Sequence, residues 1–184
     1  MIRIHCDGSP TRIAYNVINY GVMKIMEIPR SDNNLAEYIA IHESLKYIKD
    51  NIKSENVIIY SDSQNVIRVL VGKRPERNKT RIEYYKACHD IINQITNEGG
   101  TVDFRTVERK KNEAGKLLDY LRRYKSRIDF AKRFGLIYDR DNGGFRNKDS
   151  KEIVKYNKKD HRKIEFYRQR NIVINDLIPF YSRK

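Results

Sequence analysis

The chain has 184 residues, with 38 Lys and Arg against 24 Asp and Glu, which gives a formal net charge of +14 at pH 7. This length suits one domain with a hydrophobic core plus an appendage and is short for two full domains. The positive charge favours a polyanionic partner, and the presence of only two cysteines implies neither a disulfide framework nor a metal cluster.

The positive charge is concentrated toward the C-terminus. Residues 121–184 hold 19 Lys and Arg and 8 Asp and Glu, a net charge of +11, whereas residues 1–120 hold 19 and 16, a net charge of +3. No apolar run approaches the roughly 18 residues needed to span a bilayer, and a strand starting at Ile2 leaves no room for a signal peptide. We therefore expect a cytoplasmic protein that makes no membrane contact and binds nucleic acid.

The chain is expected to open with a strand that ends in a carboxylate. Ile2, Ile4 and Cys6 occupy alternate positions, so a strand places them on one face and Asp7 on the other. Residues 13–20 and 22–28 are short and rich in β-forming residues, which predicts the second and third strands of an antiparallel meander.

A helix is expected next, with Ser31 or Asp32 as its cap and Glu37 near its start. Further along, a β-branched run predicts a strand buried on both faces that stops at Asp62. The remaining elements expected before the last helix are a short helix over residues 64–70, a basic loop over 72–79, a helix over 80–97 and a strand over 101–107.

The last helix is predicted to run to about Phe134, because an apolar seam with steps of three and four residues continues from Ala114 to Ala131. Its distal half would be covered by the tail or by a second copy of the chain, so a dimer through this helix is one alternative. We predict a catalytic domain over residues 1–134 and a basic, helical C-terminal extension over residues 135–184, in which Lys151 to Arg170 is the main helical stretch.

Three motifs follow one another in the first half of the chain: Asp7-Gly8-Ser9, Asn33-Asn34-x-x-Glu37-Tyr38 and Tyr60-Ser61-Asp62-Ser63-Gln64. In this order they resemble the first three signatures of the ribonuclease H family, over roughly residues 1–120. The resemblance implies an α/β fold with a mixed five-stranded sheet, three antiparallel strands followed by parallel strands, flanked by helices. The order of the predicted elements fits the same architecture.

The resemblance also implies a metal site. Phosphodiester hydrolysis by two Mg²⁺ ions needs hard oxygen ligands, and Asp7 would bridge the ions while Glu37 and Asp62 each hold one side, with Mn²⁺ as a substitute metal. The family commonly carries a fourth ligand, an Asp directly after an Ala at the start of the last helix, but here Gly115 stands at that position. Asp119, one turn further on, is the favoured replacement.

Alternatives to Asp119 are Glu113 and a site with three carboxylates. The loop before the last helix also lacks the histidine that many family members carry. The resemblance implies endonucleolytic hydrolysis of the RNA strand of RNA–DNA hybrids. A DNA-cutting nuclease or resolvase on the same fold and a non-catalytic nucleic-acid-binding module remain alternatives.

Substrate contacts are assigned by the same resemblance to residues that follow the carboxylates and to the basic loop. Turn formation, helix capping and a solvated loop are the structural alternatives for these residues. The candidates are Gly8 and Ser9 through the backbone, Asn34 and Gln64 through side chains, and Lys73, Arg74, Arg77, Lys79 and Arg81 as phosphate ligands.

Overall fold

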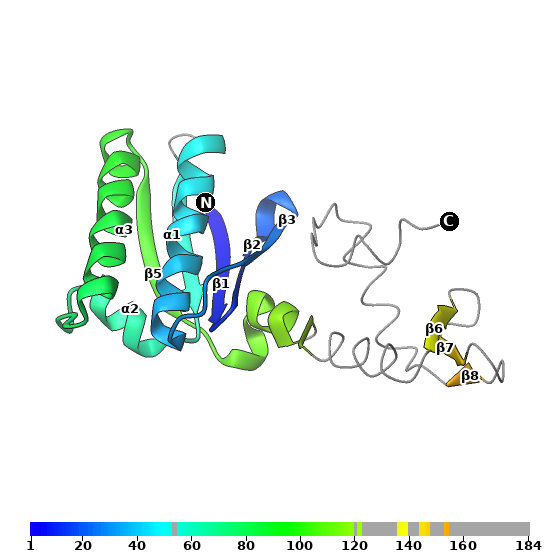
Figure 1. Cartoon of the computed structure of the whole chain (residues 1–184). Helices are drawn as coiled ribbons and strands as arrows, with labels where there is room; N and C mark the ends of the chain where they lie inside the picture. Colours follow the sequence, from blue (N-terminus) through cyan, green and yellow to red (C-terminus); the bar gives the residue numbers. More distant parts are fainter. Residues whose placement is uncertain (53–54, 120, 123–135, 140–143, 148–152, 155–184) are drawn as a thin grey trace. The chain divides into compact units, whose positions relative to one another are not determined.

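The computed structural model describes residues 1–52, 55–119, 121–122, 136–139, 144–147 and 153–154 (Figure 1). The described residues fall into two units, of which the first is Met1–Leu118 and the second begins at Asp119.

The first unit is built on a five-stranded sheet with the order β3-β2-β1-β4-β5. The strand β1 pairs with β2 antiparallel and with β4 parallel, β2 pairs with β3 antiparallel, and β4 pairs with β5 parallel, which confirms the predicted mixed sheet. The strands are β1 (Ile2–Ser9), β2 (Arg12–Val17), β3 (Val22–Glu27), β4 (Asn56–Ser61) and β5 (Thr101–Thr106).

In the described part of the first unit, the sheet is accompanied by the helices α1 (Asn33–Asn51), α2 (Gln64–Leu70) and α3 (Lys79–Asn97) and by the helical residues 113–118. The helical residues 119 and 121–122 belong to the second unit. The 3-10 turns η1 (Ile18–Tyr20) and η2 (Arg109–Lys111) are short connectors. The predicted second strand therefore ends three residues early, at Val17. The reason is η1, which closes on Gly21 at a φ of 63°, a conformation that favours glycine.

Helix α1 begins where the capping chemistry predicts. The side chain of Asp32 accepts a hydrogen bond from the backbone N–H of Leu35 at 2.9 Å, which satisfies one of the free donors of the first turn. Asn78 caps α3 in the same way, accepting from the N–H of Arg81 at 3.1 Å. These two caps fix the starting points of α1 and α3.

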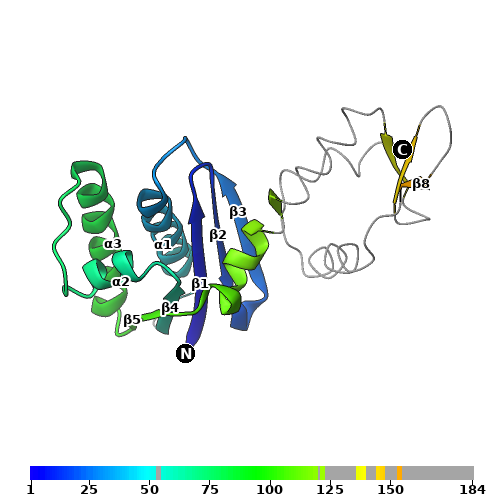
Figure 2. The same cartoon turned by 90° about the horizontal axis from the view of Figure 1, so that it is seen from below.

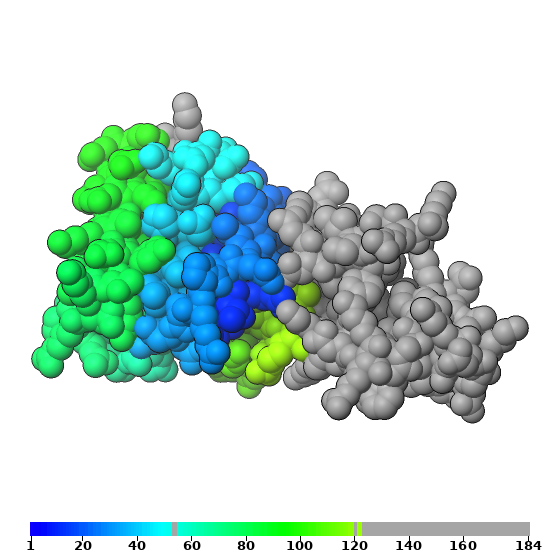
Figure 3. Space-filling view, viewed as in Figure 1, coloured from blue at the N-terminus to red at the C-terminus, as the bar shows by residue number. Residues whose placement is uncertain are grey.

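The helices cover opposite faces of the sheet, because successive side chains of β1 point in opposite directions. The Cys6 thiol donates to Ser44 Oγ on α1 at 3.3 Å, whereas the neighbouring His5 accepts the N–H of Glu113 at 3.0 Å. Helices α1 and α3 pack side by side on the first face (Figures 1 and 3), and the helical residues 113–118 lie on the other face (Figure 2). The main core lies between the sheet and α1, and includes Ile4, Ile41, Leu45 and Ile59.

The second unit contains a three-stranded antiparallel sheet, β6 (Leu136–Asp139), β7 (Gly144–Asn147) and β8 (Ile153–Val154). The prediction of a helical extension is wrong for these residues. Asp139 pairs with Gly144 across a sequence rich in turn-forming residues, and this arrangement favours a hairpin over a helix. The rest of the predicted helical stretch, and the last helix beyond residue 122 with its proposed dimer contact, lie outside the described residues.

No helix in the described part of the chain is long and apolar enough to cross a membrane.

Candidate active site

The site is organised by Gly8, which lies in the central strand β1 directly after Asp7. A Cβ atom at this position would lie 2.3 Å from the carbonyl carbon of Ala36 and 2.5 Å from the nitrogen of Glu37, so only glycine fits. The absence of a side chain lets the backbone of β1 touch the first turn of α1. The strand expected to end at Asp7 thus continues to Ser9, and Gly8 within it brings Asp7 and Glu37 together.

The carboxylate of Glu37 is buried and held by two donors. The Gly8 backbone N–H donates to it, and Ser61 Oγ donates to Glu37 Oε2 at 3.1 Å. Ser61, the last residue of β4, accepts in turn from the Ser63 N–H at 3.0 Å. The end of β4 therefore fixes the orientation of Glu37 as well as the position of Asp62, which follows it.

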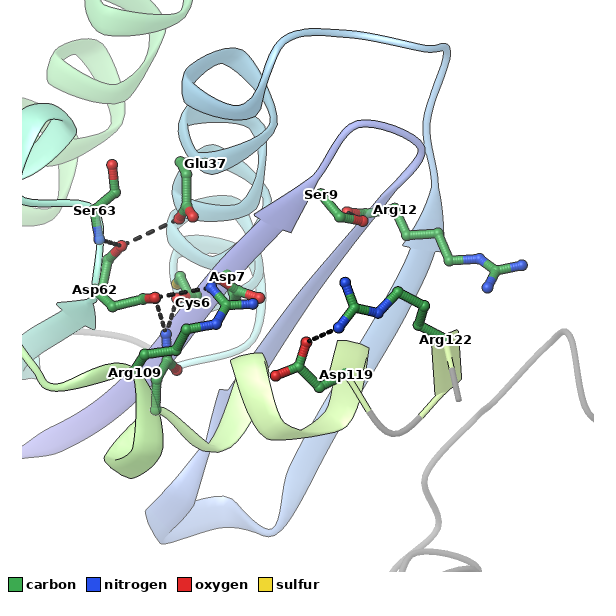
Figure 4. A network of polar contacts seen from close by, with 12 residues as sticks. Cys6, Asp7, Ser9, Arg12, Glu37, Asp62, Ser63, Arg109, Asp119 and Arg122 are labelled. Atoms are coloured by element: carbon green, nitrogen blue, oxygen red, sulfur yellow. Dashed lines mark hydrogen bonds and ion pairs between the residues drawn. The ribbon is translucent and has the colours of Figure 1, made fainter. Parts of the chain in front are cut away.

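Asp7, Glu37 and Asp62 each offer a carboxylate oxygen, and these oxygens lie within 4.8 Å of one another (Figure 4). They come from β1, α1 and the end of β4, elements that are far apart in the sequence. Asp7 is only 1% exposed, and its Oδ1 accepts no hydrogen bond among the described residues. A set of three carboxylates with an unsatisfied oxygen fits a hard divalent cation such as Mg²⁺.

Burial and mutual repulsion make the ionised form of these carboxylates costly. Burial, with the charge of Asp62 as the next cause, raises the pKa of Asp7 to about 7, although Arg109 acts in the opposite direction. Burial also raises the pKa of Glu37 well above its usual value, followed by the charges of Asp7 and Asp62. Such displaced pKa values are typical of functional sites, because structural carboxylates are seldom buried together.

Two residues from the loop before the last helix reach the cluster. Asn112 is buried and its Nδ2 donates to the Cys6 carbonyl at 2.9 Å and to Asp62 Oδ1 at 2.7 Å. Arg109 Nη1 lies 3.0 Å from Asp62 Oδ2 and 3.8 Å from Asp7 Oδ1 (Figure 4). Asn112 therefore links β1 to Asp62, and Arg109 supplies positive charge to two of the three carboxylates.

Position 115, where the family's fourth carboxylate was expected, faces the cluster. A Cβ atom on Gly115 would lie 3.4 Å from Asp7 Oδ2. Glu113, the alternative ligand, has its Oε1 2.6 Å from Lys116 Nζ. Asp119 belongs to the second unit, where its Oδ1 lies 3.4 Å from Arg122 Nη2, and its role as a fourth ligand stays a prediction.

His5 is buried in β1, next to Cys6 and two residues before Asp7. Burial lowers its pKa, against the opposing charge of Glu113, and its Nδ1 accepts the N–H of Glu113 at 3.0 Å. This bond attaches the start of the last helix to β1, two residues before Gly115.

The candidate substrate residues fall into two groups. Asn34, Arg74, Arg77 and Arg81 line one hollow of about 570 Å³, with Glu76 at its wall. Gly8 is tightly packed, the Ser9 hydroxyl donates to the Arg12 carbonyl at 2.9 Å, and Gln64, Lys73 and Lys79 are exposed outside the residues that line the hollow.

Glu76 is a residue that the sequence reasoning missed. Its Oε1 accepts the backbone N–H groups of Arg77 and Asn78 at 2.9 and 3.0 Å, and its Oε2 accepts the Tyr38 hydroxyl at 3.3 Å. Burial alone would raise its pKa, but these hydrogen bonds and the charge of Arg81 lower it. A carboxylate thus orders the basic loop.

Arg109, Asn112 and Ser61 were also missed as site residues, although Ser61 stands inside the third quoted motif. A polar residue that ends a buried strand is a usable signal, and it points to Ser61. Arg109 stands in a run of three cations that reads as a solvated surface, so no comparable signal marks it.

The fold is shared with known ribonucleases H. One similar structure is the N-terminal RNase H domain of a Mycobacterium tuberculosis protein, solved as a fusion with maltose-binding protein, with 19% identity and a TM-score of 0.52 over 60% of this chain and 84% of that one. A second is RNase H1 of the halophilic archaeon Halobacterium salinarum, with 18% identity and a TM-score of 0.54 over 64% of this chain and 92% of that one. A third is LC11-RNase H1 in complex with an RNA/DNA hybrid, with 20% identity and a TM-score of 0.53 over 61% of this chain and 89% of that one. Identities this low show the fold alone.

No curated protein matches the sequence. The family model described as RNase H matches residues 1–114, which is more than half of the chain. The chain therefore belongs to the ribonuclease H family of phosphodiester hydrolases.

Proposed function

We propose that the chain cuts the RNA strand of RNA–DNA hybrids endonucleolytically, with two Mg²⁺ ions held by Asp7, Glu37 and Asp62. The observation that carries the proposal is the meeting of three carboxylate oxygens within 4.8 Å at the ends of three elements. When bound, the ions supply a nucleophilic water and neutralise the leaving oxygen. Mn²⁺ is expected to substitute, since it accepts the same oxygen ligands.

The protein side of this mechanism is positioning. Gly8 and Ser61 orient Glu37, Asn112 orients Asp62, and burial in β1 fixes Asp7. Because these contacts exist before substrate arrives, the ligands need no rearrangement to receive the metal. Asp119 completes the site as the fourth ligand in this proposal.

Recognition of the substrate is assigned to the surface next to the carboxylates. LC11-RNase H1, a structure similar to this chain, was solved with an RNA/DNA hybrid, which supports this substrate class. Backbone groups of Gly8 and Ser9 and the side chains of Asn34 and Gln64 are proposed to contact the hybrid, whose RNA 2′-hydroxyls distinguish it from DNA.

The basic loop is proposed to hold phosphates. Arg74 and Arg77 are exposed and line the hollow beside Asn34. Replacing either with Ala should reduce the log-log salt slope of hybrid binding by about 0.7 to 0.9, the value for one phosphate contact. Arg68, exposed on α2 outside the residues that line the hollow, offers a matched control, and Arg68→Ala should leave the slope unchanged.

The test uses end-labelled RNA–DNA hybrid, duplex DNA, duplex RNA and a four-way junction, each with Mg²⁺ or Mn²⁺. Internal cuts in the RNA strand of the hybrid are expected, and Asp7→Asn should abolish them while hybrid binding persists. Cleavage of DNA or of the junction instead would assign the chain to a DNA-cutting function. Binding without cleavage under both metals would make it a non-catalytic module.

A further inference from the structure

The guanidinium of Arg109 lies against carboxylate oxygens for which a bound metal ion would compete. Its Nη1 is hydrogen-bonded to Asp62 Oδ2 at 3.0 Å and lies 3.8 Å from Asp7 Oδ1. We infer that Arg109 is a built-in counter-ion of the carboxylate cluster, which a divalent cation displaces on binding and which thereby sets the metal affinity of the site. This inference rests on the proposed function for the identity of the metal ligands.

The Arg109 guanidinium satisfies the carboxylate cluster only in part. At 3.8 Å the contact with Asp7 is too long for a hydrogen bond, and Asp7 Oδ1 remains without any hydrogen-bond partner among the described residues. One guanidinium facing three carboxylates leaves two negative charges that it does not balance when all groups are ionised. A divalent cation offers the charge and the directional freedom that the guanidinium lacks.

The side chain of Arg109 can leave without disturbing the loop that carries it. On one side the Val107 N–H donates to the Ser61 carbonyl at 3.0 Å, and on the other the buried side chain of Asn112 is bonded to the Cys6 carbonyl and to Asp62. The Arg109 side chain itself is 57% exposed. Exposed side chains change rotamer within nanoseconds, so displacement requires a rotation of one side chain and no backbone movement.

The neighbouring cation provides a matched control. Lys110 lies in the same turn and carries the same charge, but its side chain is 80% exposed and its Nζ is paired with Glu108 at 3.1 Å. If general positive charge near the site weakened metal binding, Lys110 and Arg109 would act alike. A counter-ion in contact with the ligands predicts that Arg109 acts far more strongly.

The counter-ion role predicts that an Arg109 substitution affects the metal-free protein more than the metal-loaded protein. Arg109→Gln removes the contact that the metal displaces, so it should lower the Tm in EDTA by about 2–4 °C and lower the Tm at saturating Mg²⁺ by less. The Kd for Mg²⁺ should fall about two- to fivefold, as expected for the loss of a partly exposed competing ion pair. Lys110→Gln should change neither quantity by a comparable amount.

The measurements are thermal melts in EDTA and in saturating Mg²⁺, and calorimetric titration of Mg²⁺ into the full chain without nucleic acid. A Tm loss of equal size in both buffers would make Arg109 a structural residue and overturn the inference, as would an unchanged or higher Kd in Arg109→Gln. The hybrid-cleavage assay answers a separate question. A wild-type chain that binds Mg²⁺ more weakly than Arg109→Gln but cuts no hybrid would reject the proposed function and support the counter-ion.

Discussion

The pKa of Asp7 predicts that a single substitution stabilises the metal-free protein. The folded carboxyl has a pKa of about 7 because it is buried beside Asp62, against a usual value of 3.8. A pKa that is raised on folding means that the folded state keeps its proton while the unfolded state loses it. The free energy of unfolding therefore falls as pH rises from about 4 to about 7 and is constant above that range.

The size of the effect on stability follows from the difference between these two pKa values. At about 1.4 kcal/mol per pH unit, the ionised Asp7 costs the metal-free protein at most about 4 kcal/mol at pH 8. Asp7→Asn keeps the shape and removes the charge. It should thus raise the free energy of unfolding at pH 8 by about 2–4 kcal/mol and have a much smaller effect at pH 5, where most of the penalty is absent.

The assay is urea denaturation of wild type and Asp7→Asn in EDTA at pH 5 and pH 8, repeated at pH 8 with Mg²⁺. The metal should stabilise the wild type and leave the variant unaffected, since it binds only the form that retains the ligand. If the variant is no more stable than the wild type at pH 8 in EDTA, the burial of Asp7 carries no net electrostatic cost and the reasoning from its pKa is refuted.

Four further substitutions test the geometry of the site. Gly8→Ala places a Cβ 2.3 Å from the backbone of α1. It should lower the free energy of unfolding by at least about 1–3 kcal/mol in urea denaturation and weaken Mg²⁺ binding. A loss of stability below about 0.5 kcal/mol, the usual range for surface changes, would contradict the tight packing of Gly8 against α1. Gly115→Asp adds a carboxylate beside Asp7, so it should lower the Tm in EDTA and enlarge the Tm gain on adding Mg²⁺, and an unchanged gain would mean that position 115 does not reach the metal. Asp119→Asn should lower hybrid cleavage at limiting Mg²⁺ more than Glu113→Gln does; the reverse ranking would transfer the fourth-ligand role to Glu113, and no effect from either would leave three carboxylates.

Much of the first unit could be predicted because its signals are local. The first strand and the cap at Asp32 depend on neighbouring residues, and both are confirmed. Asp7, Glu37 and Asp62 were grouped by the order of their motifs, and the structure brings their oxygens together. The close contact of Gly8 with α1 was not predicted, because it joins residues nearly thirty positions apart.

The contacts of Arg109 could not be predicted, because they join residues 47 and 102 positions apart in the chain and nothing in a run of surface cations indicates a buried partner. The hydrogen bond from Tyr38 to Glu76 was hidden for a similar reason, since it joins residues 38 positions apart. In the second unit the helical prediction was wrong because it followed charge composition, whereas Ile153 and Val154 are β-branched and pair with β7.

The sheet order predicts which parts of the first unit open least often. Strand β1 is central, with β2 and β4 hydrogen-bonded on its two sides, and helices cover both of its faces. Its amides can exchange with solvent deuterium only when the whole first unit opens, whereas the loop that carries Arg74 and Arg77 lies at the surface and can open locally. We therefore expect Asp7 to lie on the strand that opens least often, while the loop proposed to hold phosphates can change conformation many times before the first unit opens once.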